Sequence, residues 1–290
     1  ERGTFTVVNE TGVEEYLRGV VPLEMGRRGV EDIEALKAQA VAARTYTYRK
    51  MLQRREHPFD VLPTVSDQVY GGVHAEYHES DVAIAATRGQ VMVYGDSLIY
   101  AYYHSTCGGR TATMGDVWDK EPQPYLVSVE DRDRDGKAYC ASSRYSAWTY
   151  RWAREQLASI LRRFGGSAAC EGSVGGGLKQ LRIVSRLPCG RVGKLEAVMG
   201  HGTARFCGDK VRFALRRAES EYPILPSARF DIVQSDLRSV KVRGSGYGHG
   251  VGMCQMGAIG RARAGQTCEQ ILRAYYRGIN LVSISVPAGP

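Results

Sequence analysis

The most helix-prone part of the sequence is Glu34-Ala35-Leu36-Lys37-Ala38-Gln39-Ala40-Val41-Ala42-Ala43-Arg44-Thr45-Tyr46. Alanine has the highest helix propensity and little bulk, so the stretch predicts a helix over about residues 32–49 that packs closely against its neighbours. Lys37 and Arg44 are seven residues apart and share one face of this helix, with Thr45 nearby. They form either an anion-binding pair or a solvated basic stripe. The alanines beside them are too apolar for an exposed helix.

Outside this helix the pattern alternates between strands and helices. Val91 to Tyr94 and Leu98 to Tyr103, separated by Gly95-Asp96, predict a β-hairpin. Residues 148–163 are interpreted as a helix, and residues 181–184 and 211–214 as strands. We therefore expect an α+β fold. Residues 1–145 and 241–290 would form one discontinuous catalytic module with the alanine-rich helix and β-hairpins, and residues 146–240 an inserted β-rich subdomain.

Two shorter patterns refine this outline. The charges alternate in sign from Glu130 to Gly136, which predicts a solvated loop. Near the C-terminal end, Thr267 and Gln270 fit a capping box that would begin a helix.

The composition is that of an ordinary globular protein with an excess of positive charge. The 290 residues include 39 Lys and Arg against 31 Asp and Glu, a net charge of +8, and 34 glycines. The charge favours an anionic partner, either nucleic acid, anionic lipid or an acidic glycan. Nucleic acid is disfavoured because neither aromatic RNA-binding strings nor a helix-turn-helix pattern is present. No stretch reaches the roughly 18 apolar residues of a membrane span, so we expect that any signal or anchor has been removed.

Seven cysteines are present, and no two of them form a C-x-x-C pair. This spacing argues against a zinc ribbon or a thioredoxin-type redox site. Three disulfides with one thiol left over and a set of buried free thiols both remain open. The cysteines therefore leave the redox compartment undecided.

A first candidate for chemistry is the glutamate in Val20-Val21-Pro22-Leu23-Glu24-Met25. A carboxyl group in apolar surroundings has a raised pKa and can act as a general acid near neutral pH. The alternative is a solvent-facing or helix-capping glutamate, which is common on surfaces.

A second candidate is the polar run His104-Ser105-Thr106-Cys107-Gly108-Gly109, which follows a hydrophobic strand. Loops at strand ends commonly build sites, so a polar binding loop is the preferred interpretation. His104 and Cys107 also suggest a cysteine nucleophile or half of a metal site, but no partner histidine is identified. Pairing of Cys107 with Cys140 is a further alternative.

A third candidate is Gly244-Ser245-Gly246-Tyr247-Gly248-His249-Gly250-Val251-Gly252, with glycine at every second position. This period predicts a strand with one face free of side chains, where a ligand or another backbone can approach closely. The segment is neither G-x-G-x-x-G nor a P-loop, so nucleotide binding has no support. His249 is either a structural imidazole held by backbone groups or a substrate contact.

Together these segments resemble the SpoIID/LytB family, whose names refer to a sporulation protein and an amidase enhancer. The resemblance lies in residues 13–25, in residues 34–46, in residues 104–109 followed by 124–129, and in residues 246–258. It covers residues 1–145 and 240–286 well and the stretch between them only loosely.

The resemblance implies a peptidoglycan lytic transglycosylase that cleaves between N-acetylmuramic acid and N-acetylglucosamine, preferring strands stripped of stem peptides, with Glu24 as general acid and base. It implies cell-wall remodelling in an extracytoplasmic location, peptidoglycan strands and a cell-wall amidase as partners, no cofactor and no nucleic acid. The residues expected to contact substrate are Lys37, Arg44, Thr45, His104, Ser105, Thr106, Tyr247, His249 and Gln255. The alternative within the family is a glycan-binding or amidase-enhancing protein that does not cut.

Two departures from the family pattern concern metals and thiols. Some sporulation members carry zinc on His and Cys ligands just before a Gln-Val-Tyr sequence. Here Gln68-Val69-Tyr70 is present, but after His57 the remaining ligand positions hold Leu62, Pro63, Ser66 and Asp67, so no zinc is expected there. Cys254 and Cys268 replace other residues and are expected to be buried thiols close to each other, with a disulfide between them as the alternative.

Overall fold

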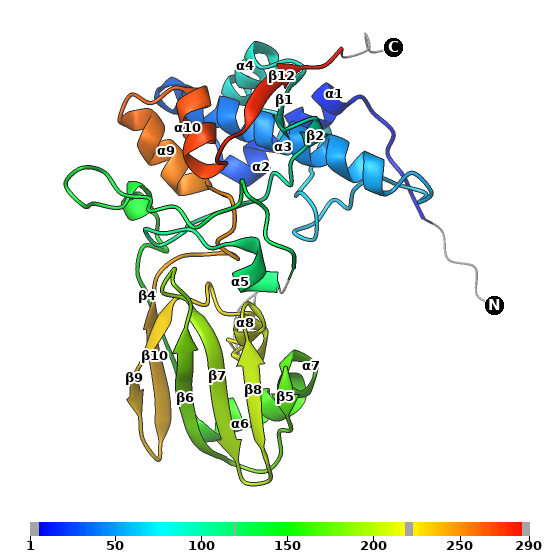
Figure 1. Cartoon of the computed structure of the whole chain (residues 1–290). Coiled ribbons are helices and arrows are strands. Elements are labelled where there is room, and N and C mark those ends of the chain that lie inside the picture. Colours follow the sequence, from blue (N-terminus) through cyan, green and yellow to red (C-terminus); the bar gives the residue numbers. More distant parts are fainter. Residues whose placement is uncertain (1–5, 119, 218–222, 286–290) are drawn as a thin grey trace. The chain divides into compact units, whose positions relative to one another are not determined.

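A computed structural model describes residues 6–118, 120–217 and 223–285 (Figure 1). The chain divides into two compact units. Unit 1 comprises Glu1–Tyr102 and Arg261–Pro290, and unit 2 comprises Tyr103–Gly260. Helices and antiparallel sheets occur together, which confirms the predicted α+β class. The boundaries predicted at residues 145/146 and 240/241 stay a prediction.

Unit 1 is built mainly of helices. Its elements are α1 (Val13–Arg18), α2 (Val21–Met25), η1 (Val30–Asp32), α3 (Ile33–Gln53), η2 (Gly72–Ala75), α4 (His78–Ala86), β1 (Gln90–Tyr94), β2 (Ser97–Leu98), α10 (Cys268–Tyr275) and β12 (Asn280–Ser283). A further helix, α9 (Gln255–Arg263), contains the boundary between the units.

Helix α3 is the centre of unit 1, as its alanine content predicts. Its apolar residues from Ala35 to Ala43 have no exposed surface. The helix contacts α1, α2, α4, α10 and β1 (Figure 1). A helix that is apolar on nearly all sides must be buried, and small side chains let its neighbours approach closely. The predicted helix is confirmed and extends four residues further, to Gln53.

The sheet of unit 1 joins the middle of the chain to its C-terminal part. Strand β1 is central in the order β12-β1-β2, and all pairs are antiparallel. Val93 pairs with Leu98 across a turn at Gly95, whose φ of 57° suits glycine, so the predicted hairpin is confirmed as far as Leu98. The predicted continuation of its second strand to Tyr103 is wrong, because β2 ends at Leu98 and Tyr103 pairs with Met253 instead. The capping box of α10 is also confirmed, because Thr267 Oγ1 accepts a hydrogen bond from the Gln270 N–H and the Gln270 side chain accepts one from the Thr267 N–H.

Unit 2 is mainly β-sheet. Its elements are β3 (Tyr103–His104), α5 (Met114–Trp118), η3 (Tyr139–Ser142), β4 (Trp148–Ala153), α6 (Arg154–Ile160), η4 (Leu161–Gly165), α7 (Gly166–Ala168), β5 (Glu171–Gly172), β6 (Leu178–Arg186), β7 (Val192–Met199), β8 (Thr203–Cys207), α8 (Lys210–Ala214), β9 (Phe230–Ser235), β10 (Ser239–Gly244) and β11 (Met253–Cys254).

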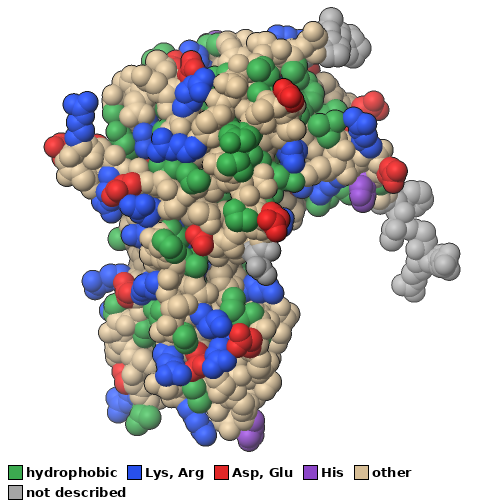
Figure 2. Space-filling model, in the orientation of Figure 1, with side chains coloured by type: hydrophobic (Ala, Val, Ile, Leu, Met, Phe, Trp, Pro, Cys, Tyr) green, Lys and Arg blue, Asp and Glu red, His purple; other side chains and the backbone are tan. Residues whose placement is uncertain are grey.

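Two antiparallel sheets, β5-β8-β7-β6 and β4-β10-β9, share one hydrophobic core with helix α6 (Figure 1). Trp152, Leu195 and Phe206 are fully buried in it. Figure 2 shows basic and acidic side chains intermingled over unit 2. There Glu196 pairs with both Arg182 and Arg205. Part of the positive charge on this sheet is therefore already neutralised within the protein.

Two predictions for unit 2 are wrong in part. Residues 148–153 were expected to be helical but form strand β4, because Trp148, Tyr150 and Trp152 recur with a period of two and Trp152 fills the core. The strand-like interpretation of residues 211–214 is also wrong, since they lie in helix α8.

The charged run 130–136 is a solvated loop except at Asp131. Asp131 has no exposed surface, and its backbone N–H donates to Gly109 O. The expectation of a fully solvated loop is therefore wrong at this residue.

The glycine-rich segment is not the strand that its period of two predicts. Strand β10 ends at Gly244, and beyond it Gly246, Gly248, Gly250 and Gly252 have φ values of 91°, 103°, 90° and 72°. These left-handed conformations need glycine. The predicted close approach of another backbone does occur, because a Cβ atom on Gly246 would lie 2.9 Å from the Thr106 carbonyl oxygen. A Cβ atom on Gly250 would overlap the Arg191 side chain.

We expect Gly250→Ala to destabilise unit 2 by about 1–3 kcal/mol from backbone strain alone, with a further cost for displacing the buried Arg191 side chain. The matched control is Gly136→Ala, which has a φ of 80° but nothing within 4 Å of the added Cβ. Urea unfolding followed by tryptophan fluorescence reports on unit 2, which holds all three tryptophans. Equal losses of stability in Gly250→Ala and Gly136→Ala would contradict the close contact between Gly250 and the Arg191 side chain.

None of the helices among the described residues has the length and hydropathy that crossing a membrane requires.

Candidate functional site

Glu24 lies on the short helix α2, and the packing of that helix turns it outward. Val21, Pro22 and Met25 are buried, whereas Leu23 is exposed and Glu24 is half-buried. Proline in the first turn suits the start of a helix, since its missing N–H would be unpaired there. Glu24 Oε1 accepts a hydrogen bond of 3.0 Å from the Val69 N–H. The fold thus holds the carboxylate against residues 68–70.

Two tyrosines support this region. The rings of Tyr16 and Tyr70 stack with centroids 5.0 Å apart, and the Tyr16 hydroxyl donates to Gln68 Oε1. Burial, followed by the negative charge of Glu24, raises the pKa of Tyr16. The charge of the Glu24 carboxylate therefore acts on the Tyr16 hydroxyl and helps to keep it protonated. Sequence reasoning missed Tyr16 and Gln68, although the Gln68-Val69-Tyr70 string marked the segment.

Asp67 is the carboxylate that precedes this segment, and it is already neutralised. Its side chain is 1% exposed and pairs with Lys50 and Arg54, each at 2.8 Å. Burial alone would raise the pKa of Asp67, but hydrogen bonds from Lys50, the Leu62 N–H and Tyr46 lower it. Asp67 is a structural carboxylate that anchors the loop to α3.

Arg44 and Thr45 do not face solvent, and the interpretation of Arg44 as an anion-binding residue is wrong. The Arg44 side chain is fully buried and donates two hydrogen bonds to the Glu14 carboxylate, at 2.8 and 2.7 Å. Thr45 Oγ1 donates to Val41 O and accepts from the Met92 N–H. Both residues hold the core of unit 1 together. The sequence could not show this, because Glu14 lies 30 positions away.

Lys37 differs from Arg44 although it shares the helix. Its Nζ is 2.7 Å from Glu34 Oε1, and both side chains are more than a quarter exposed. Lys37 therefore remains accessible to an anionic ligand.

The other predicted residues lie in unit 2, where two segments far apart in sequence meet. Strand β3 pairs in parallel with β11, and Thr106 forms a two-way backbone bridge with Tyr247. The rings of His104 and His249 are 5.5 Å apart, and Ser105 O accepts from the Met256 N–H, next to Gln255. The structure thus brings together the two unit 2 segments that sequence reasoning selected.

Only some of these side chains are accessible. His104, Thr106 and Gln255 are buried, and Thr106 Oγ1 lies 2.7 Å from Ser143 Oγ. Ser105 and Tyr247 are half-buried. The Tyr247 ring packs against the Tyr145 ring at a tilt of 34° with centroids 4.3 Å apart, a pairing that sequence reasoning missed.

His249 is held by backbone groups at both ring nitrogens. Its Nε2 lies 3.0 Å from Tyr103 O, and its Nδ1 accepts from the Val251 N–H. Burial lowers the pKa of His249 to about 4, with Arg191 and Arg212 adding to the effect and Asp209 opposing it. Of the two interpretations left open, the structural imidazole fits these contacts.

This shift predicts a loss of stability in acid. The unfolded chain binds a proton at His249 below about pH 6.5, whereas the folded chain binds it only near pH 4. Stability is therefore complete above pH 6.5 and falls by about 3 kcal/mol towards pH 4. The measurement is tryptophan-monitored urea unfolding across this range. His249→Gln should weaken the dependence of the free energy of unfolding on pH, whereas His201→Gln, at an exposed histidine, should leave it unchanged. The same pH dependence in the wild type and both variants would contradict the assignment of the acid-induced loss to His249.

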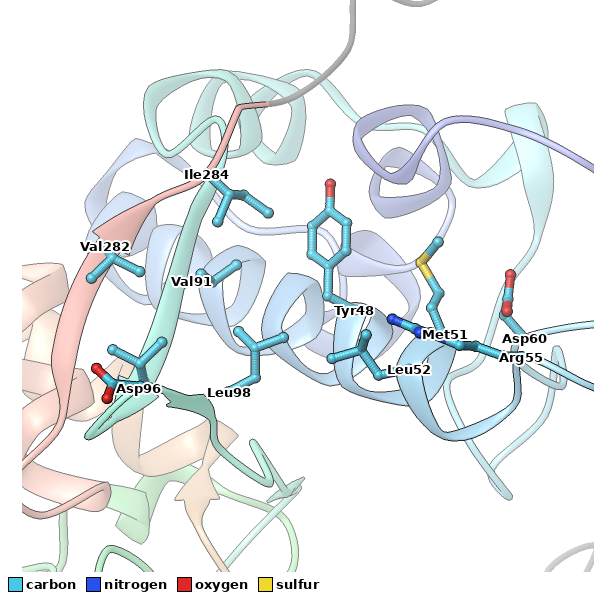
Figure 3. A pocket seen from close by; sticks show the side chains of 11 residues that line it. Tyr48, Met51, Leu52, Arg55, Asp60, Val91, Asp96, Leu98, Val282 and Ile284 are labelled. Atoms are coloured by element: carbon cyan, nitrogen blue, oxygen red, sulfur yellow. The ribbon is translucent and has the colours of Figure 1, made fainter.

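A separate pocket of about 580 Å3 opens in unit 1 (Figure 3). Its lining residues are Tyr48, Met51, Leu52, Arg55, Asp60, Val91, Val93, Asp96, Leu98, Val282 and Ile284. The lining is mainly apolar and comes from α3, the residues 55–60 that follow it, β1, the turn at Asp96, β2 and the β12 region. None of the residues predicted to bind substrate lines it.

Comparison with known families gives two matches. Residues 1–94 match the family model described as Stage II sporulation protein, and residues 140–252 match a domain of unknown function (DUF8618). The first match contains Glu24, Lys37 and Arg44. The second covers most of the β-sheet part of unit 2 and the glycine-rich segment.

Three relatives align with almost the whole chain. An uncharacterized protein of Brachyspira hyodysenteriae is 32% identical over 280 residues, covering 96% of this chain and 69% of that protein. The stage II sporulation protein D of Bacillus subtilis is 29% identical, with 94% of this chain and 75% of the relative covered. The amidase enhancer of Bacillus subtilis is 28% identical over 92% of this chain, which spans 40% of that relative's length.

Proposed function

Because this chain belongs to the stage II sporulation protein D family and has a cell-wall-related role, we propose that it is a peptidoglycan lytic transglycosylase with Glu24 as its catalytic residue. The proposed substrate is a glycan strand stripped of stem peptides. The proposed product ends in 1,6-anhydro-N-acetylmuramic acid.

The observation that carries the proposal is the setting of Glu24. The carboxylate is half-buried on an apolar helix, and the Val69 N–H fixes its Oε1. Tyr16 stacks on Tyr70 and donates to Gln68, two residues of the same 68–70 segment. A partly desolvated, oriented carboxyl group is suited to proton transfer in both directions.

The proposed chemistry needs only one carboxyl group. Protonated Glu24 gives its proton to the oxygen that links the muramoyl C1 to the next sugar, and the C1–O bond breaks. The resulting carboxylate then takes the proton from the muramoyl C6 hydroxyl as that oxygen attacks C1. The ring closes, Glu24 regains its proton and no water is consumed.

A hydrolytic glycosidase would use a second carboxylate as nucleophile or as base towards water. Asp67 is the carboxylate nearest in sequence to the segment that holds Glu24. It is buried and paired with two cations, so it is unsuited to that task.

Accessibility selects among the predicted substrate contacts. We assign glycan contact to Lys37 in unit 1 and to Ser105 and Tyr247 in unit 2, since their side chains are partly exposed. Lys37 offers a positive charge for the lactyl carboxylate of muramic acid, and Tyr247 offers a flat face for a sugar ring. The residues that support the fold of their own units are the buried Arg44, Thr45, His104, Thr106 and Gln255 and the half-buried His249, whose two ring nitrogens are held by backbone groups.

An extracytoplasmic location is part of the proposal, because peptidoglycan lies outside the cytoplasmic membrane. The disulfide between Cys170 and Cys207 supports it, since disulfides persist in oxidising compartments. The other five cysteines are buried free thiols. The sequence left open either three disulfides or buried free thiols, and the structure has one disulfide together with buried thiols.

The test is mass spectrometry of the products formed from amidase-stripped strands and from intact peptidoglycan. Anhydromuramoyl ends, in higher yield from the stripped strands, are expected. Sedimentation of the protein with the glycan without any new chain ends would instead support the second candidate, a glycan-binding protein that assists a cell-wall amidase. The similarity to the amidase enhancer is the observation that favours this candidate.

A further inference from the structure

Three cysteines and one aspartate converge inside unit 2. The side-chain ligand atoms of Cys107, Asp131, Cys140 and Cys254 all lie within 4.8 Å of one another, and all four residues are buried. Cys107 Sγ is 3.6 Å from Cys140 Sγ and 3.2 Å from Asp131 Oδ2. These residues come from three segments that are distant in sequence, so the fold itself assembles the cluster.

The spacing suits a single tetrahedral metal ion. Zinc–sulfur bonds of about 2.3 Å at tetrahedral angles place two sulfur ligands about 3.8 Å apart, and a carboxylate oxygen about 3.5 Å from sulfur. The observed distances, 3.6 Å between the Cys107 and Cys140 sulfur atoms and 3.2 Å from Cys107 Sγ to Asp131 Oδ2, are close to these ligand–ligand distances. An iron–sulfur cluster contains several metal ions and holds its thiolates farther apart than this compact set.

Backbone N–H groups already point at the sulfur atoms. Cys107 Sγ accepts from the Gly109 N–H at 3.2 Å, a geometry that follows from the φ of 74° at Gly108 and 93° at Gly109. Cys254 Sγ accepts from the Cys107 N–H at 3.1 Å and from the Gly257 N–H at 3.2 Å. Such donors stabilise thiolates and occur as the outer hydrogen bonds of metal sites.

The surroundings also offset negative charge. Cys254 immediately precedes helix α9, whose first turn supplies the Gly257 N–H, and the N-terminus of a helix favours a thiolate. The buried Arg191 donates to Cys107 O. One guanidinium group thus lies beside a site whose four anionic ligands exceed the charge of a divalent ion.

We propose that Cys107, Cys140, Cys254 and Asp131 bind one Zn2+ ion that ties the residue 103–110 segment to the residue 253–257 segment. Each thiol gives its proton to the solvent on binding. The ion is structural, because all four positions of a tetrahedron are filled by protein ligands. This site differs from the position after His57 where the sequence predicts no zinc. The site does not depend on the proposed lytic activity. It agrees with the expectation that Cys254 is buried, and the expected closeness of Cys254 to Cys268 stays a prediction.

The first experiment measures metal in the intact chain. The protein, prepared under reducing conditions and dialysed, is expected to contain one zinc per chain by plasma mass spectrometry. Zinc-stripped protein should take up one Co2+ and develop the intense visible absorption of tetrahedral cobalt–thiolate coordination. This spectrum needs no substitution, so it tests the site even if a variant misfolds.

The second experiment uses matched variants. Cys107→Ser should lose the bound zinc, whereas Cys189→Ser, which replaces a buried thiol of the same unit outside the cluster, should retain it. Asp131→Asn should weaken zinc retention against a chelator at least tenfold and change the cobalt spectrum.

Three outcomes would overturn the proposal. Reduced protein that takes up neither zinc nor cobalt would show that the cluster is only a group of packed thiols. A disulfide between Cys107 and Cys140 in protein kept under reducing conditions would assign a different role to two of the ligands. Iron with inorganic sulfide would contradict the assignment of a single zinc ion.

Discussion

Replacing Glu24 by glutamine is expected to slow the release of anhydromuramoyl ends from stripped glycan strands by about a hundredfold to ten-thousandfold, the usual range for loss of general acid–base catalysis. Glutamine has nearly the shape of glutamic acid, and its amide oxygen can still accept the hydrogen bond from the Val69 N–H. The substitution therefore removes the transferable proton while leaving the local structure in place. The rate is measured by quantifying anhydromuramoyl ends over time.

The matched control is Glu15→Gln, which removes an exposed carboxylate from the neighbouring helix α1. It changes the net charge by the same amount and should retain the wild-type rate. Glu24→Gln should also still sediment with the glycan, because only the chemical step is impaired. A Glu24→Gln protein that releases ends at the wild-type rate would exclude Glu24 as the catalytic residue.

Replacing Arg44 by methionine is expected to destabilise unit 1 by about 3–5 kcal/mol, because it leaves the Glu14 carboxylate buried without its cation. The pair is fully enclosed, with the two side chains 0% and 5% exposed. Arg44 also donates to Gln90 O and Ile84 O, and Glu14 accepts from the Gly89 N–H. One ion pair therefore connects α1, α3, α4 and the start of β1. Urea unfolding followed by far-ultraviolet circular dichroism measures the effect.

The matched control is Lys37→Met on the same helix, whose ion pair with Glu34 is partly exposed. Exposed ion pairs contribute about 0–1 kcal/mol, so its effect should be small. The double variant Arg44→Met with Glu14→Leu should recover part of the lost stability, since no buried charge remains. Similar losses for Arg44→Met and Lys37→Met would show that the buried pair has no special role.

The parts of the fold that local sequence determines could be predicted. The alanine-rich stretch determines α3, Gly95-Asp96 determines the hairpin, and Thr267 with Gln270 begins α10. Strand β4 could not be predicted in the same way. Its residues suit a helix or a strand, and pairing with β10 together with burial of Trp152 decides between them.

The candidate site shows the same division. The motif around Glu24 marks a glutamate whose position in the structure is half-buried and oriented. The role of Arg44 depends on Glu14, and the role of His249 depends on Tyr103, 146 positions away. Spacing along the chain carries no information on such contacts. The cysteines show this most clearly, because Cys107 and Cys254 are 147 positions apart and meet only in the folded unit.

The central claim is that Glu24 cleaves the glycan without water, and cleavage in heavy-oxygen water tests it most directly. Wild-type protein, its Glu24→Gln variant and stripped glycan strands are incubated in this solvent, and the new chain ends are weighed by mass spectrometry. We predict anhydromuramoyl ends without the heavy isotope from the wild type, and about a hundredfold to ten-thousandfold slower release of such ends from the variant. Reducing ends that carry the heavy oxygen, or equal release by the variant, would contradict the account.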